Sequence, residues 1–206
     1  MATLLSYALT TVADVKESLG IDAGDTSKDN IITRKINQAT KMIEKFTGVR
    51  FASTVYTDEE YDATNVDQLV LKQRPIITFT SFSIRDTSLN QNDWEVIDSA
   101  LYFVDYSAGV IDLLFKLDGR WNRYKVTYTA GYATIPEDIA EAAVTLASFY
   151  VENATSGQAI KSKSEGARKI EYYNSGSSGS GDSLFEQLGI DEILQSYADY
   201  PINADK

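Results

Sequence analysis

The residues best suited to acid–base chemistry are three carboxylates, Glu59, Glu60 and Asp112. Two carboxylates can hydrolyse a bond when they flank it from opposite sides. Glu59 and Glu60 are adjacent in a stretch that is prone to form a strand, so their side chains point to opposite faces and cannot share one bond. We therefore interpret these carboxylates as solvated charges, and the sequence predicts no catalytic residue.

Other common catalytic groups are missing. The 206 residues contain no His and no Cys, which excludes Ser-His-Asp and Cys-His nucleophiles as well as Cys-ligated zinc. Neither standard type of glycine-rich phosphate-binding loop is present. The sequence therefore predicts a protein that is not an enzyme and that needs no cofactor.

A polar loop, DAGDTSKDN, carries spaced carboxylates at Asp22, Asp25 and Asp29 that could suit calcium. A twelve-residue calcium loop needs a glycine at its sixth position and a closing glutamate, and neither aligns here. We therefore expect no metal site.

The chain is acidic, with 30 Asp and Glu against 19 Lys and Arg and a net charge of −11. This balance speaks against tight, sequence-independent DNA binding, which needs clustered cations. The basic patch Lys161, Lys163, Arg168 and Lys169 lacks interleaved aromatic residues and is a weak signal for nucleic acid. The sequence has no transmembrane stretch and no signal-peptide pattern, so we expect a protein kept inside a cell, without a membrane partner.

Caps and apolar spacing predict two helices in the first 50 residues. The first spans about residues 12–19 and follows a capping pair, Thr11 and Asp14. The second spans 28–47, where apolar residues step by three and four, and it ends at Gly48.

A third helix is predicted over 136–153, with Thr134 and Glu137 as a capping box and Pro136 in the first turn. Because it is apolar over most of its circumference, it needs partners on more than one side. It is either a central core helix within one chain or a helix that also meets a neighbouring subunit. The candidate contact residues are Ile139, Ala143, Leu146 and Tyr150.

Residues 51–130 form short β-prone runs separated by turn signals. Asn65 is one such signal, and Asp118-Gly119 is typical of a tight hairpin between two strands. The alternation of apolar and polar residues slips between Phe79 and Phe82, which predicts a β-bulge.

Trp94, Trp121 and the many Tyr residues are expected in the core of the sheet or at subunit contacts. The predicted fold class is α+β. It comprises a helical body (helices about 12–19, 28–47 and 136–153), a β-rich insertion at about 51–130 and an extended C-terminal arm.

The predicted domains are residues 1–153 and a C-terminal arm, 154–206. The arm contains the basic patch, the glycine-serine tract SGSSGSG and two short helical pieces. Its apolar residues suit docking on a partner rather than a core of its own. With the four cations of the basic patch, the candidate docking residues are Leu184, Phe185, Leu188, Ile190, Ile193, Leu194 and Tyr197.

The order of these pieces resembles the head–tail connector (adaptor) proteins of tailed bacteriophages and related prophage particles. The resemblance covers about residues 9–153 and is carried by the segments FTGVRF, LKQRPI and YTAGYATIPEDI. It identifies residues 1–153 as a connector domain.

The resemblance implies a structural virion protein, assembled in the host cytoplasm and placed in the neck of the particle. Family members form a ring, commonly of twelve subunits, beneath the portal. The ring joins the head to the tail and extends the DNA channel. The implied partners are further copies of the chain, the portal protein and a stopper or tail protein, while DNA passes through without sequence-specific binding.

Two other functions stay open from the sequence. The chain could be another neck protein, a stopper or a tail terminator, although the helix–β–helix order argues against this. It could also be a soluble binding module, or a hydrolase that uses carboxylates of the β-rich insertion. Ring formation, alone or on the portal, would separate a neck protein from the others.

Overall fold

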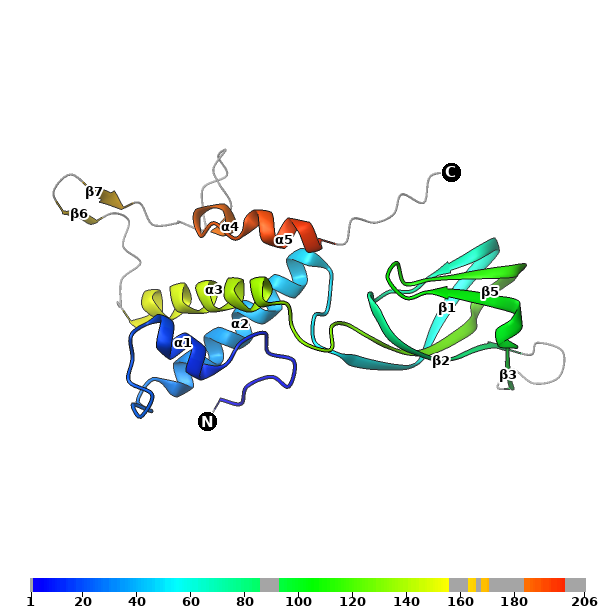
Figure 1. Cartoon of the computed structure of the whole chain (residues 1–206), viewed down its shortest axis with the longest axis horizontal. Helices are drawn as coiled ribbons and strands as arrows, with labels where there is room; N and C mark the ends of the chain where they lie inside the picture. The colour runs from blue at the N-terminus through cyan, green and yellow to red at the C-terminus, as the bar shows by residue number, and fades with distance from the viewer. Residues whose placement is uncertain (1, 86–92, 156–162, 166–167, 171–183, 199–206) are drawn as a thin grey trace. The chain divides into compact units, whose positions relative to one another are not determined.

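The computed structural model of the chain has a mixed α+β fold, which confirms the predicted class. It describes residues 2–85, 93–155, 163–165, 168–170 and 184–198. Two compact units form, a helical unit of residues 1–48 and 136–206 and a β unit of residues 49–135 (Figure 1). The predicted domain boundary at residue 153 stays a prediction. Within the described part of the chain, no helix is both long and apolar enough to cross a membrane.

Helices α1 (Val12–Ser18) and α2 (Asp29–Thr47) form where the sequence predicts them. The Thr11 hydroxyl accepts a hydrogen bond from the Asp14 N–H at 3.3 Å, and the Asp14 carboxylate accepts one from the Thr11 N–H at 3.0 Å. The side-chain bond from Thr11 lowers the pKa of Asp14. α2 ends at Gly48, whose left-handed φ of 73° suits a residue without Cβ. Both predicted helix ends are confirmed.

Helix α3 (Glu137–Thr155) starts two residues later than a Thr134 cap would require. The carbonyl of Pro136 accepts the first helical hydrogen bond, from the Ala140 N–H at 3.0 Å. Proline disfavours helical geometry in the residue before it, so Ile135 stays outside the helix. The predicted capping box is therefore wrong, although the helix itself is confirmed.

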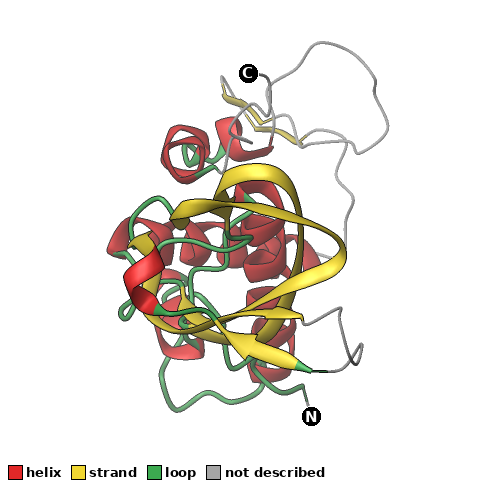
Figure 2. Ribbon diagram, turned by 90° about the vertical axis from the view of Figure 1, so that its right-hand side faces the viewer, coloured by secondary structure: helices red, strands yellow, loops and turns green. Residues whose placement is uncertain are grey.

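A sheet of five antiparallel strands makes up the β unit. The strands are β1 (Thr54–Val70), β2 (Ile76–Arg85), β3 (Trp94–Val96), β4 (Tyr102–Asp105) and β5 (Val110–Ala130), and a 3₁₀ helix, η1 (Ser99–Leu101), precedes β4. The order is β1-β5-β2-β3, and β4 also pairs with β5. The long strands bend strongly rather than lying flat, so the sheet curves over its own core (Figure 2).

The predicted hairpin at Asp118-Gly119 is wrong, because both residues lie within the continuous strand β5. Tyr61 pairs with Tyr124 and Ala63 with Gly119. Four residues of β5 therefore lie between these two pairs, where β1 has one. These turn-forming residues thus belong to a bulge within a long two-stranded ribbon. The predicted bulge between Phe79 and Phe82 is confirmed, since the register of β2 against β5 shifts between Phe79 and Ser81.

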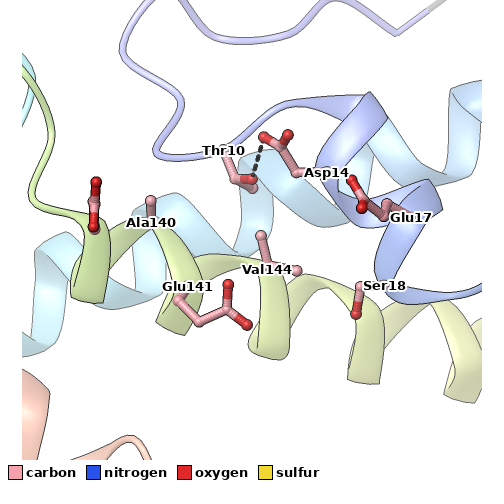
Figure 3. A pocket seen from close by; sticks show the side chains of 8 residues that line it. Thr10, Asp14, Glu17, Ser18, Ala140, Glu141 and Val144 are labelled. Carbon is pink, nitrogen blue, oxygen red and sulfur yellow. Dashed lines mark hydrogen bonds between the residues drawn. The ribbon is translucent and has the colours of Figure 1, made fainter.

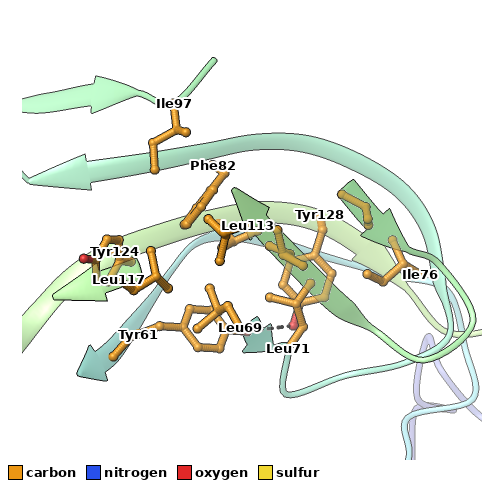
Figure 4. Packing of buried hydrophobic residues seen from close by; sticks show 14 of the residues in the cluster. Tyr61, Leu69, Leu71, Ile76, Phe82, Ile97, Leu113, Leu117, Tyr124 and Tyr128 are labelled. Carbon is orange, nitrogen blue, oxygen red and sulfur yellow. Dashed lines mark hydrogen bonds between the residues drawn. The ribbon is translucent and has the colours of Figure 1, made fainter. Parts of the chain in front are cut away.

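Aromatic residues fill the core of the β unit, as the sequence predicts for its tyrosines (Figure 4). Phe82, Tyr124 and Tyr128 are at most 1% exposed. Trp94 lies outside this core, half-buried, with Arg85 and Lys125 each 4.7 Å from its ring centre. The side chain of Trp121 lies outside the described residues.

Glu59 anchors two tyrosines at the edge of this core. The hydroxyl groups of Tyr61 and Tyr128 each donate a hydrogen bond of 2.6 Å to Glu59 Oε2. The Lys72 ammonium lies 3.4 Å from Glu59 Oε1. Burial, together with the bonds to Glu59, raises the pKa of both tyrosines. The carboxylate therefore stabilises neutral phenols in an apolar environment.

The loop between α1 and α2 is held by Lys16. Its ammonium lies 2.6 Å from Asp29 Oδ1 and donates to the Ala23 carbonyl at 3.3 Å, and the side chain is 7% exposed. The carboxylates of Asp22 and Asp25 accept backbone N–H bonds from two residues further on, at 2.8 and 2.9 Å. No cluster suited to a metal ion occurs among the described residues.

We predict that alkaline pH destabilises the β unit. Because the pKa values of Tyr61 and Tyr128 are raised, these neutral phenols contribute fully to the stability of the β unit below about pH 10, the pKa of tyrosine in an unfolded chain. This contribution is lost as the pH rises further. In a spectrophotometric titration, Tyr61 and Tyr128 should ionise after the exposed tyrosines. The variant Y61F/Y128F should lose this delayed fraction, and an unchanged titration curve would contradict the assignment.

Replacing Lys16 by Met should lower the free energy of unfolding by about 1–3 kcal/mol, because a largely buried donor is lost from Asp29 and Ala23. Urea denaturation measures this difference. The control is Lys41→Met, at an exposed position of α2. Equal stabilities for the two variants would rule out a structural role for the Lys16 ion pair.

Candidate functional site

The three carboxylates considered for catalysis are each held in a structural contact. Glu59 binds two tyrosines, as described above. Glu60 Oε1 lies 3.5 Å from the guanidinium of Arg85, and Asp112 accepts a hydrogen bond of 2.7 Å from Gln68 on the neighbouring strand. These contacts leave the carboxylates as parts of the sheet surface.

The predicted contact residues of α3 lie inside the helical unit. Ile139, Ala143 and Leu146 are completely buried. The Tyr150 hydroxyl donates to Met42 Sδ of α2 at 2.8 Å. All four residues therefore pack within the chain, and contact with a neighbouring subunit stays a prediction.

The short helix α5 (Asp191–Tyr197) packs against α2 and α3 of its own chain, and α4 (Leu184–Gln187) packs against α5 and contacts α2. The rings of Phe185 and Phe46 meet edge to face at 4.7 Å, and the Tyr197 hydroxyl donates to Asp138 Oδ2 at 3.0 Å. Of the predicted docking residues, three are buried, namely Phe185, Ile190 and Leu194. The others here are half-buried: Leu184, Leu188, Ile193 and Tyr197. Docking on a partner stays a prediction for all seven.

Most of the basic patch lies on a two-stranded antiparallel ribbon, β6 (Lys163–Glu165) with β7 (Arg168–Ile170). Lys169 pairs with Ser164 across the ribbon. Lys161 lies outside the described residues. The backbone of this ribbon therefore carries three residues of the basic patch, Lys163, Arg168 and Lys169.

The structure has an apolar face on β4 and β5 that was not predicted from the sequence. We define this β4–β5 face by Leu101, Phe103 and Leu114, which are 43%, 69% and 80% exposed. Beside it lies a pocket of about 290 Å³ lined by Ala100, Tyr102, Phe103, Asp112, Leu113 and Leu114. The adjacent pair Leu113–Leu114 is the signal that could have revealed it, because neighbouring strand residues point to opposite faces.

An acidic groove runs between α1 and α3, with a volume of about 520 Å³ (Figure 3). We define this acidic groove by Asp14 and Glu17 of α1 and Glu137 and Glu141 of α3. Thr10, Ser18, Ala140 and Val144 complete its lining. The two walls of the groove lie more than 100 residues apart in the chain, so no local sequence pattern indicated it.

A protein-family model described as head completion protein matches residues 8–174. Three solved structures with 16% sequence identity have a similar fold. A chain from the neck of an empty GTA particle, computed with C6 symmetry, gives a TM-score of 0.59 and covers 98% of this chain and 95% of that chain. A chain from the neck of a native GTA particle, computed with C12 symmetry, gives 0.55 with 99% and 96% coverage.

The third structure, the virion of a native gene transfer agent (GTA) particle, gives a TM-score of 0.57 with 98% and 95% coverage. No curated protein matches the sequence. At this identity the solved structures establish a shared fold. The family model spans α1 to α3, the whole β unit and the β6–β7 ribbon. The chain therefore belongs to the head completion protein family.

Proposed function

We propose that this chain forms a ring beneath the portal, joins the head to the tail in the neck of a phage-like particle and extends the DNA channel. The observation that carries the proposal is the similarity of fold to neck chains over 95% or more of both chains. Membership of the head completion protein family supports the same role. A ring of twelve copies would agree with the C12 symmetry of one of those necks.

The β4–β5 face supports assembly. Proteins that act as monomers rarely expose large contiguous apolar patches, and such patches commonly mark sites of protein–protein contact. Here Phe103 of β4 and Leu114 of β5 are exposed together with Leu101, the last residue of η1. In a ring, each copy contacts two others and the layers above and below, so this face would be covered.

The charge of the chain fits a channel for DNA. A net charge of −11 per copy would give a ring a strongly negative field. Carboxylates facing the channel would repel phosphates and let DNA slide through without binding, since binding needs clustered cations.

The basic patch is our candidate for the contact with the portal. Because α5 packs on α2 and α3 of its own chain, we assign the portal contact to the β6–β7 ribbon rather than to the apolar residues of α4 and α5. Lys161, Lys163, Arg168 and Lys169 would then bind carboxylates of the portal, with a stopper or tail protein on the other side of the ring.

Mass photometry of the full-length chain, alone and mixed with portal assemblies from the same particle, tests the proposal. For twelve copies of 22.8 kDa, the portal peak should gain about 270 kDa. A chain that never adds to the portal would contradict the position beneath it and would favour another neck position or a binding module.

We predict that L114D/F103S abolishes incorporation into rings while the protein stays folded, because both side chains are mainly exposed and the changes make the β4–β5 face polar. The matched control is Val96→Asp, at a 67% exposed residue of β3. Thermal melting should give similar midpoints for all three proteins. Normal ring assembly by L114D/F103S would show that the face is not an assembly contact.

Reversing the four cations of the basic patch to Glu should leave α1 to α5 folded but reduce joining to portal assemblies by roughly tenfold or more, because like charges would then meet. Circular dichroism checks the fold, and co-sedimentation with the portal measures the joining. Undiminished co-sedimentation would show that the basic patch is not part of the contact with the portal.

A further inference from the structure

The acidic groove brings together four carboxylates without a cation. Its eight lining residues include no Lys or Arg. Glu137 and Glu141 are four residues apart on α3, and Asp14 and Glu17 are three apart on α1, so each pair repels along its own helix. The described residues of the groove therefore produce a negative electrostatic potential, which favours a positively charged partner.

The outer face of α2 has the opposite charge. Arg34, Gln38, Lys41 and Lys45 lie at steps of four, three and four residues, so they follow one side of the helix, and all are exposed. We call these four residues the basic stripe. Lys41 and Lys45 again form a like-charge pair four residues apart, and no carboxylate interrupts the stripe.

The acidic groove and the basic stripe lie on opposite sides of the helical unit. The buried residues of α2, Ile32, Ile36, Ala39 and Ile43, occupy the helix side opposite the stripe. α2 packs against both α1 and α3, and Figure 3 shows it passing behind the groove that they form. The stripe therefore faces away from the groove.

We propose that the basic stripe of one copy docks in the acidic groove of the next copy. The inference rests on the proposed ring, in which cyclic symmetry brings two different faces of the same chain together at every contact. Each copy supplies one acidic groove and one basic stripe, so in a closed ring every groove is paired with a stripe. The like-charge repulsion within each face is relieved when the opposite face covers it, and complementary charges fix the register of neighbouring copies.

Charge reversal of each face in the full-length chain tests the contact. One variant, K41E/K45E, reverses the stripe. The other, E17K/E141K, reverses the groove while sparing the capping residue Asp14 and the first turn of α3. Each variant alone should lower the fraction of portal assemblies that carry a ring by roughly tenfold or more, as measured by mass photometry.

A 1:1 mixture of the two variants should recover ring assembly. In an alternating ring, half of the contacts are wild type and the other half are reversed on both sides, so all contacts are again complementary. The matched control is D67K/E95K, which reverses two exposed carboxylates of the β unit and should assemble like the wild type. Thermal melting identifies any variant that fails to fold.

The outcomes separate this inference from the proposed function. Normal rings from K41E/K45E and E17K/E141K, or a mixture that does not recover, would overturn the groove–stripe contact while leaving the ring intact. Absence of rings from the wild-type chain would contradict the proposed function and this inference with it. Loss in both variants with recovery in the mixture is the expected result.

Discussion

The packing of α3 against α1 and α2 is the contact on which the rest of the structure depends. α3 follows the β unit in the sequence, whereas α1 and α2 precede it, so this contact closes the helical unit across an insertion of 87 residues. Fully buried Ile139, Ala143 and Leu146 supply the apolar surface. The outer side of α3 forms one wall of the acidic groove. In its first turn, Asp138 accepts a hydrogen bond from the Tyr197 hydroxyl of α5.

Local signals in the sequence predicted helices α1, α2 and α3, although not the start of α3, whereas the hairpin predicted at Asp118-Gly119 was wrong. The Thr11–Asp14 capping box and Gly48 act through neighbouring residues, so they could be read directly. Asp118-Gly119 has the composition of a hairpin, but it lies opposite Ala63 and Thr64 within a long strand pair, which only the fold reveals. The acidic groove and the β4–β5 face likewise arise from segments that the sequence does not show side by side.

Membership of the head completion protein family confirms the resemblance read from the sequence and the expectation of a structural, non-enzymatic protein. The physical chemistry of the chain agrees with this role. Glu59, Glu60 and Asp112 hold neighbouring side chains in the sheet. The exposed features are faces suited to protein contact, namely an apolar strand pair and a helical unit with opposite charges on opposite sides.

Electron cryo-microscopy of the intact particle tests the central claim most directly. The account predicts density for this chain as a closed ring with cyclic symmetry, located between the portal and the tail and surrounding the DNA channel. Density for the chain at another place in the particle, or as single copies outside the channel axis, would contradict it.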